Sequence, residues 1–186
     1  MRIYTRTDCE PVGDQADLYQ KVVVCGGSNL AQLPSGQLFL CVDRKWKDTG
    51  QTLISCISLA DGEQYLCRRE DIIGTLKPEL LPDESKLHLS QICRHEDRGF
   101  EDQSPLYSGY CFLKDGKYAA GVWLYSEQEV RDYIELQKMY QHRVLICDRD
   151  DFAVMEIVEG KMVFPDEQAL REFYREHGPD GGMTMA

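Results

Sequence analysis

The chain has 186 residues, of which 42% are hydrophobic, and its formal net charge is −11. This length allows one domain or two small ones, and the apolar content is enough for a real core, so a globally disordered chain is not expected. No apolar run approaches the roughly 18 residues of a membrane span, and the N-terminus lacks the apolar stretch of a secretory signal, so we expect a cytoplasmic protein.

Residues 1–81 are predicted to form a β-rich module. The first twenty residues are polar and irregular, and four strands are then expected, at 21–25, 37–43, 52–59 and 63–67. Asp61-Gly62 gives the last two strands a tight hairpin turn. Residues 69–76 predict a short strand or a helical turn. Short strands at regular spacing are typical of a small barrel or sandwich, and we predict an SH3-like small barrel.

Residues 82–106 are predicted to be a charged connector, in which apolar residues cluster only in the stretch KLHLSQIC. This change of composition is the best candidate for a boundary between modules. A second module is expected over 107–180, followed by a flexible tail at 181–186.

The second module predicts five strands, at 107–113, 118–125, 142–147, 152–158 and 161–164. Ser126 is placed as a helix N-cap with Glu129 three residues later, which is a capping box, and the helix is expected to reach Tyr140. A last helix is expected from Pro165 to about His177. The order ββ-α-βββ-α predicts an α+β fold with an antiparallel sheet and helices on one face.

An apolar run, Val144–Cys147, ends at three carboxylates, Asp148, Asp150 and Asp151. Phosphatases of the haloacid dehalogenase type also place Asp-x-Asp after an apolar strand, but that chemistry needs a parallel sheet. Here a second alternating strand, AVMEIV, follows almost at once. Because Asp is a favoured turn residue, we predict a tight reversal between antiparallel strands instead of a catalytic motif.

No cofactor, metal or catalytic residue is predicted. The spacing of His88, Cys93 and His95 does not match a zinc site, and neither glycine-rich phosphate-binding motif occurs. The eight cysteines include no C-x-x-C pair. Four of them lie in apolar, strand-like runs and are expected to be reduced, buried thiols: Cys25, Cys41, Cys56 and Cys111.

The negative charge is uneven, with −3 over residues 1–92 and −8 over residues 93–186. A field of that sign repels phosphate backbones, so we expect no direct nucleic-acid binding, and it favours a protein partner with a basic surface. The alternative is an acidic surface that serves only solubility.

The predicted partner-binding residues are mostly carboxylates: Glu96, Asp97, Glu101 and Asp102 in the connector, Glu127, Glu129, Asp132 and Glu135 on the first helix, and the aromatic Trp46 in a basic loop. Carboxylates three or four residues apart on a helix repel one another, and a basic partner would neutralise them. Favourable interaction with the helix dipole is the alternative, and it accounts only for the first two of the helical four.

The stretch WLYSEQEVRDYIELQKMYQHRVLICDRDDFAVMEIVEGKMVFP resembles small acidic accessory proteins carried on plasmids and integrative elements of gut Firmicutes. Small acidic proteins from such elements include anti-restriction and anti-CRISPR inhibitors. The resemblance implies inhibition by binding, without catalysis. It carries no shared motif, so it assigns no functional residue.

We therefore expect a non-enzymatic interaction protein: a mobile-element or phage inhibitor whose acidic surface binds a basic, nucleic-acid-binding host-defence nuclease such as a CRISPR effector. One alternative is a small enzyme or ligand-binding domain with a pocket between the two modules. Another is a regulatory protein of the mobile element.

Overall fold

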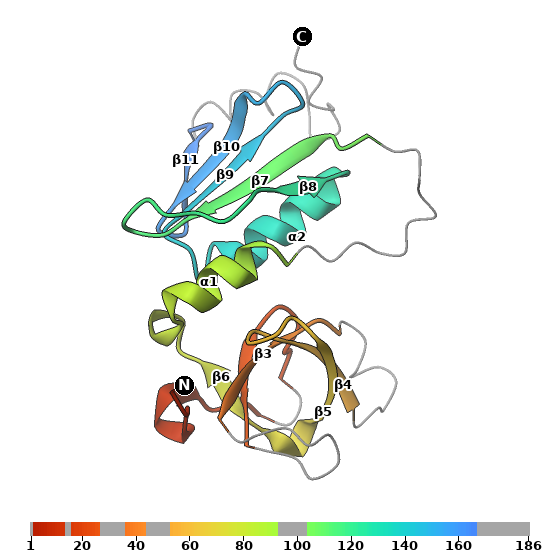
Figure 1. Ribbon diagram of the computed structural model, residues 1–186, viewed down its shortest axis with the longest axis vertical. Coiled ribbons are helices and arrows are strands. Elements are labelled where there is room, and N and C mark those ends of the chain that lie inside the picture. Colours follow the sequence, from red (N-terminus) through yellow and green to blue (C-terminus); the bar gives the residue numbers. More distant parts are fainter. Residues whose placement is uncertain (1, 14–15, 27–35, 44–52, 93–103, 167–186) are drawn as a thin grey trace. The chain divides into compact units, whose positions relative to one another are not determined.

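The computed structural model describes residues 2–13, 16–26, 36–43, 53–92 and 104–166 (Figure 1). The chain divides into two compact units, Met1–Glu96 and Asp97–Ala186. The described part of each unit contains one antiparallel sheet and an α-helix. This combination of antiparallel sheets and helices confirms the α+β class. Among the described residues, no helix is long and apolar enough to cross a bilayer.

In its described residues, the first unit contains six strands, three short 3-10 turns and one helix. These are η1 (Arg6–Asp8), β1 (Cys9–Glu10), β2 (Val22–Cys25), β3 (Gln37–Cys41), β4 (Leu53–Ser58), β5 (Gln64–Arg68), η2 (Arg69–Asp71), β6 (Ile72–Leu76), η3 (Pro78–Leu80) and α1 (Asp83–Ser90). The strand order is β1-β6-β2-β3-β4-β5. The four predicted strands are confirmed, although the second ends two residues early, and the segment 69–76 forms both a turn and a strand.

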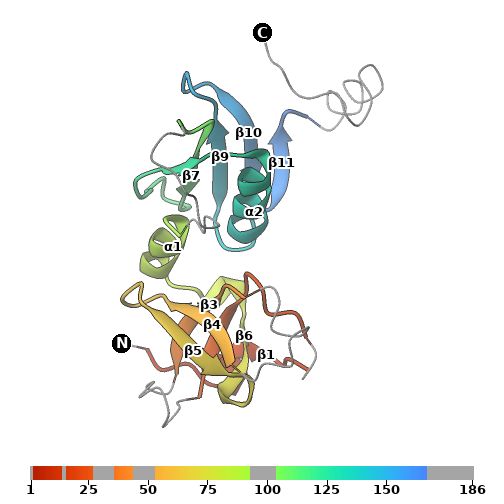
Figure 2. The same cartoon turned by 90° about the vertical axis from the view of Figure 1, so that its right-hand side faces the viewer.

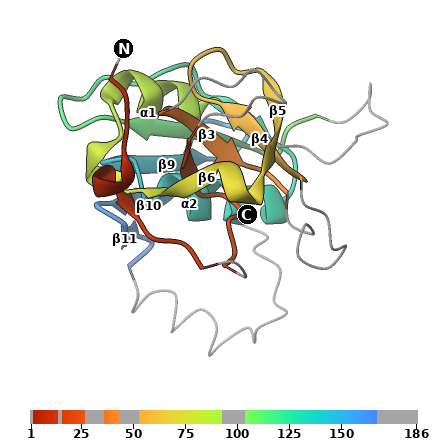
Figure 3. The same cartoon turned by 90° about the horizontal axis from the view of Figure 1, so that it is seen from below.

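The first sheet curls around one apolar interior (Figures 1 and 3). Buried residues alternate along β4, where Ile54, Cys56 and Ser58 are buried, whereas every residue of β2 is buried. Such alternation places one set of side chains on the inner face. That set forms the core, with Leu18, Val23, Cys25, Phe39, Cys41, Ile54, Cys56, Cys67 and Ile72.

The predicted hairpin at Asp61-Gly62 is confirmed, because β4 and β5 pair directly across it. Gly62 has a φ of +77°, which residues with a side chain rarely adopt. An Asp61 carboxylate oxygen accepts a hydrogen bond from the Glu63 backbone N–H at 3.0 Å, and this bond holds the pKa of Asp61 below its usual value.

Helix α1 occupies the predicted connector, where only a short element was expected. Its His88 ring contacts the backbone oxygen of Leu59 at 3.1 Å. This contact attaches the helix to the end of β4, and the helix therefore belongs to the first unit.

The second unit contains five strands and one described helix. They are β7 (Tyr107–Phe112), β8 (Val122–Leu124), α2 (Glu127–Gln137), β9 (Arg143–Cys147), β10 (Ala153–Val158) and β11 (Lys161–Phe164). The strand order is β11-β10-β9-β7-β8, and α2 packs against one face of this sheet (Figure 2). The predicted ββ-α-βββ order is confirmed. The last predicted helix lies outside the described residues, except for Pro165 and Asp166, which are not helical.

Two predicted boundaries in this unit are wrong. The strand expected over 118–125 is reduced to three residues, with an isolated bridge from Tyr118 to Phe112. The intervening Ala119-Ala120-Gly121 has low strand propensity, which explains the gap. Helix α2 ends at Gln137, and the predicted last turn to Tyr140 is a tighter turn in which the Tyr140 N–H donates to the Gln137 carbonyl.

Helix α2 begins with the predicted cap. The Ser126 hydroxyl accepts a hydrogen bond from the Glu129 N–H at 3.2 Å. The Glu129 carboxylate accepts from the Tyr125 N–H at 2.8 Å, one residue before the N-cap that a standard capping box would use. Glu129 is therefore part of the helix start.

Candidate functional site

The structure places four of the predicted partner-binding residues together, on helix α2. These are Glu127, Glu129, Asp132 and Glu135. The other predicted partner-binding residues, Glu96, Asp97, Glu101, Asp102 and Trp46, lie outside the described residues.

The carboxylates of α2 have contacts within their own helix. Lys138 pairs with Glu135 at 2.6 Å, and the Gln128 side chain donates to Asp132 at 3.0 Å. Glu127 lies 3.9 Å from the Arg131 guanidinium. These contacts offset part of the repulsion between neighbouring carboxylates on the helix, so a basic partner is not needed to explain all of it.

Two α2 carboxylates remain well placed to meet a partner. The side chains of Glu127 and Glu135 are 60% and 61% exposed. Glu129 is half-buried at the helix start, so reversing its charge would disturb the cap as well as the surface. A charge-reversal test should therefore use the two exposed residues.

The three carboxylates after β9 form a turn, as predicted. One oxygen of Asp148 accepts hydrogen bonds from the N–H groups of Asp150 and Phe152, at 2.9 and 3.0 Å. Asp151 adopts a φ of +62°, and β9 and β10 pair antiparallel. This arrangement is not the parallel sheet that the phosphatase motif requires.

We expect Asp148→Ala to destabilise the second unit by about 1–2 kcal/mol, because two turn N–H groups lose their acceptor. Asp150→Ala is the matched control: its backbone N–H takes part in the turn, and the substitution keeps that group. We expect this control to change the free energy of unfolding by less than about 0.5 kcal/mol. Urea denaturation measures both, and equal effects would contradict the assigned role of Asp148.

The candidate metal ligands are not brought together in the described part of the chain. His88 contacts Leu59, while Cys93 and His95 lie outside it. Over the described ranges, no group of three or more His, Cys, Asp or Glu side chains is arranged to hold a metal ion.

The cysteines predicted to be buried thiols are all buried and free, namely Cys25, Cys41, Cys56 and Cys111. Burial raises the pKa of the Cys111 thiol to about 12. A hydrogen bond with the Tyr133 hydroxyl, at 3.1 Å, lowers this pKa by a smaller amount. This thiol is therefore protonated at neutral pH and is a poor nucleophile.

The register of β7 shows which residues face away from α2. The Tyr133 hydroxyl lies 3.1 Å from the Cys111 sulfur, and a Cβ on Gly109 would lie 2.7 Å from the Tyr133 ring. Gly109 and Cys111 therefore face the helix. Because side chains alternate along a strand, Tyr110 and Phe112 point to the opposite side of the sheet.

We call this opposite side the open face. Direct cross-strand partners share a face, so Arg143 lies beside Phe112, Leu145 beside Tyr110, and Glu156 beside Leu145. By the same register and the bridge from Phe112, the open face includes Ser108, Tyr110, Phe112, Tyr118, Trp123, Arg143, Leu145, Cys147, Glu156, Val158, Lys161 and Phe164.

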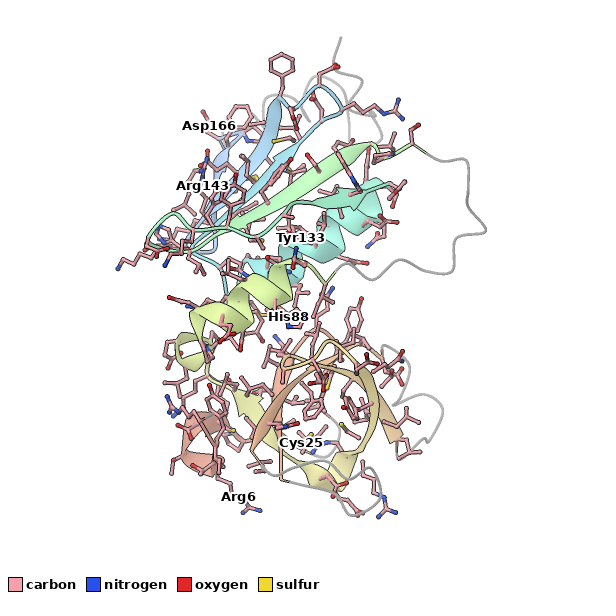
Figure 4. All side chains as sticks on the ribbon, viewed as in Figure 1. Arg6, Cys25, His88, Tyr133, Arg143 and Asp166 are labelled. Atoms are coloured by element: carbon pink, nitrogen blue, oxygen red, sulfur yellow. The ribbon has the colours of Figure 1, made fainter. Side chains whose placement is uncertain are left out.

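A row of contacts crosses the open face. The rings of Tyr118 and Phe112 have centroids 5.1 Å apart, and the Arg143 guanidinium carbon lies 4.8 Å from the centre of the Phe112 ring. Arg143, labelled in Figure 4, also pairs with Glu156 at 2.6 Å. The row thus joins a tilted contact between aromatic rings, a cation–π contact and an ion pair.

Large aromatic side chains of the open face are exposed to solvent. Trp123 is 60% exposed, Tyr118 is 58% exposed and Phe164 is 45% exposed. The sequence reasoning missed this surface. The available signal was Tyr110-Cys111-Phe112, where aromatic residues occupy alternate positions, but the sequence does not say which face the helix covers.

Comparison of the chain with family models, with curated proteins and with solved structures finds no match. The residues themselves therefore carry the functional argument.

Proposed function

We propose that this chain is a non-enzymatic interaction protein of a mobile element or phage. It acts in the cytoplasm by binding a host-defence nuclease with a basic nucleic-acid groove, such as a CRISPR effector, and inhibits that nuclease without chemistry. The observation that carries the proposal is the open face of the second unit, with its exposed aromatic residues beside an arginine.

The composition of the open face supports a protein partner. Trp, Tyr and Arg dominate the energetic centres of protein interfaces. Trp and Tyr bury large areas with few rotatable bonds, and Arg presents a planar group with five hydrogen-bond donors. Trp123, Tyr118 and Arg143 bring these three types to one surface. The ion pair from Arg143 to Glu156 fixes the arginine, which lowers the entropy lost on binding.

The charge of the chain supports a basic partner. A net charge of −11 attracts a positively charged protein over distances of about one Debye length and accelerates the encounter. Glu127 and Glu135 lie on the opposite side of the sheet from the open face, so one flat partner surface cannot cover both. We propose that contacts with the open face provide most of the binding affinity, while the carboxylates of α2 attract the basic partner and speed its association.

The finer fold of the first unit is also part of the proposal: we infer an SH3-like small barrel. The curled six-stranded sheet around a single core supports this assignment. The module contributes a rigid scaffold, and no functional residue follows from its fold.

Inhibition of a purified RNA-guided DNA nuclease tests the proposal. The double variant Trp123→Ala with Tyr118→Ala should raise the half-inhibitory concentration at least about 30-fold, the equivalent of roughly 2 kcal/mol for lost interface anchors. Glu127→Lys with Glu135→Lys should instead slow association at low salt and have little effect at high salt.

Phe152→Ala is the matched aromatic control, since Phe152 is 70% exposed but lies in the turn between β9 and β10. It should inhibit as the unmodified chain does. Full inhibition by the double variant of Trp123 and Tyr118 would contradict the claim that the open face binds the nuclease. If the unmodified chain inhibits neither RNA-guided nor restriction nucleases, the proposed class of partner is wrong.

A further inference from the structure

Four thiols meet inside the first unit. Cys25, Cys41, Cys56 and Cys67 come from the four strands β2, β3, β4 and β5, and all are fully buried. Figure 4 shows Cys25 within the curled sheet. A cysteine packed alone in a core acts as a small hydrophobe, but sulfur atoms that meet in pairs, as these do, can also react with one another.

Cys41 and Cys56 are direct cross-strand partners with sulfur atoms 3.4 Å apart. The flanking backbone hydrogen bond runs from the Val42 N–H to the Ser55 carbonyl, so the cysteine pair occupies a non-hydrogen-bonded site. Cα atoms at such sites are about 4.5 Å apart, which lies within the range of about 4.4–6.8 Å that disulfides span.

Cys25 and Cys67 meet across the interior. Strands β3 and β4 separate β2 from β5 in the sheet order, yet the two sulfur atoms are 3.6 Å apart. The curl of the sheet produces this contact. A bond between these sulfur atoms would join an inner strand to the edge strand.

Cys67 is the sulfur best placed to react first. It accepts hydrogen bonds from the thiols of Cys25 and Cys56, and these bonds lower its pKa, while the pKa of each donor is raised. It lies on β5, the last strand of the sheet order, beside the exposed Leu66. Edge strands open at lower free energy than central strands, which gives a small oxidant access.

We propose that the four thiols are an oxidation site, in which two molecules of hydrogen peroxide convert them to two disulfides, Cys25–Cys67 and Cys41–Cys56. The thiolate attacks one peroxide oxygen, the O–O bond breaks, and a sulfenic acid forms as water leaves after protonation. The partner thiol then attacks the sulfenic sulfur, the S–S bond forms, and a second water leaves. Each pair of thiols gives two electrons to one molecule of hydrogen peroxide as its disulfide forms.

The two disulfides would fasten the sheet around its core. Each bond closes a loop of the unfolded chain and lowers its entropy, so the oxidised first unit resists unfolding better than the reduced one. The first unit would then become more stable when the cell is under oxidative stress.

Peptide mapping of the full chain tests the pairing. After treatment with hydrogen peroxide and alkylation of the remaining thiols in denaturant, digestion should give cross-linked peptides for Cys25–Cys67 and Cys41–Cys56, and dithiothreitol should separate both. The midpoint of thermal unfolding of the first unit should rise by on the order of 10 °C.

Variants separate the two bonds. Cys67→Ala should remove the Cys25 cross-link and keep the Cys41–Cys56 one, while Cys111→Ala, in the second unit, should keep both. If Cys67→Ala does not fold, the peptide map of the unmodified chain still decides which cysteines pair. Four alkylated thiols after peroxide, either of the other two pairings, or retained zinc that protects the thiols until it is chelated would overturn the proposal.

Discussion

Replacing Phe39 with alanine is expected to destabilise the first unit by about 3–5 kcal/mol, which is a large part of the stability of a small domain. Phe39 is fully buried in the core, and its ring meets the Tyr65 ring edge-on with centroids 5.6 Å apart. The substitution removes this contact and leaves a cavity in an interior formed by a single curled sheet. Chemical denaturation, followed by spectroscopic signals of residues in β2 to β6, measures the loss in the free energy of unfolding.

Two controls bracket this result. Phe39→Leu keeps most of the volume and should cost less than Phe39→Ala, because the cavity is smaller. Leu66→Ala changes a side chain that is 56% exposed on β5 and should cost less than about 0.5 kcal/mol. A Phe39→Ala loss as small as that of Leu66→Ala would show that the interior is not packed as described.

The second large effect is expected at Tyr133, where α2 meets the sheet. Tyr133 is 3% exposed, its ring fills the space above Gly109, and its hydroxyl contacts the Cys111 sulfur. Tyr133→Ala should destabilise the second unit by about 3–5 kcal/mol. Tyr133→Phe keeps the ring and loses only the hydroxyl contact, so about 1 kcal/mol is expected.

Gly109→Ala tests the same contact from the strand. A Cβ at this position would lie 2.7 Å from the Tyr133 ring, which forces the ring or the helix to move. We expect a loss of about 1–3 kcal/mol in unfolding experiments on the second unit. Combining Gly109→Ala with Tyr133→Ala should cost less than the sum of the two, because the smaller side chain removes the clash. Strict additivity would contradict the direct contact.

Local patterns predicted most of the secondary structure. The alternation in LISCIS fixed β4, the glycine of Asp61-Gly62 fixed its hairpin, and Ser126 fixed the start of α2. The turn role of Asp148 was also predicted, because it depends on residues two and four positions away. Each of these features depends on neighbours in the sequence.

Features that depend on distant residues were not predicted. The meeting of Cys25 with Cys67 follows from the curl of the sheet, which no local pattern encodes. The open face depends on which side of the sheet receives α2. The contacts of Asp132 with Gln128 and of Glu135 with Lys138 are different: they are local, four and three residues apart, and the sequence analysis overlooked them because it compared only the carboxylates with one another.

Strand β11 has a consequence for the solubility of the chain. It is the last strand in the order of its sheet, and all four of its residues are exposed, including Met162, Val163 and Phe164. An apolar edge of this kind can template the addition of further strands, and a charged residue at its start opposes such growth. Lys161 holds that position, and we expect its positive charge to oppose the pairing of this edge with further strands.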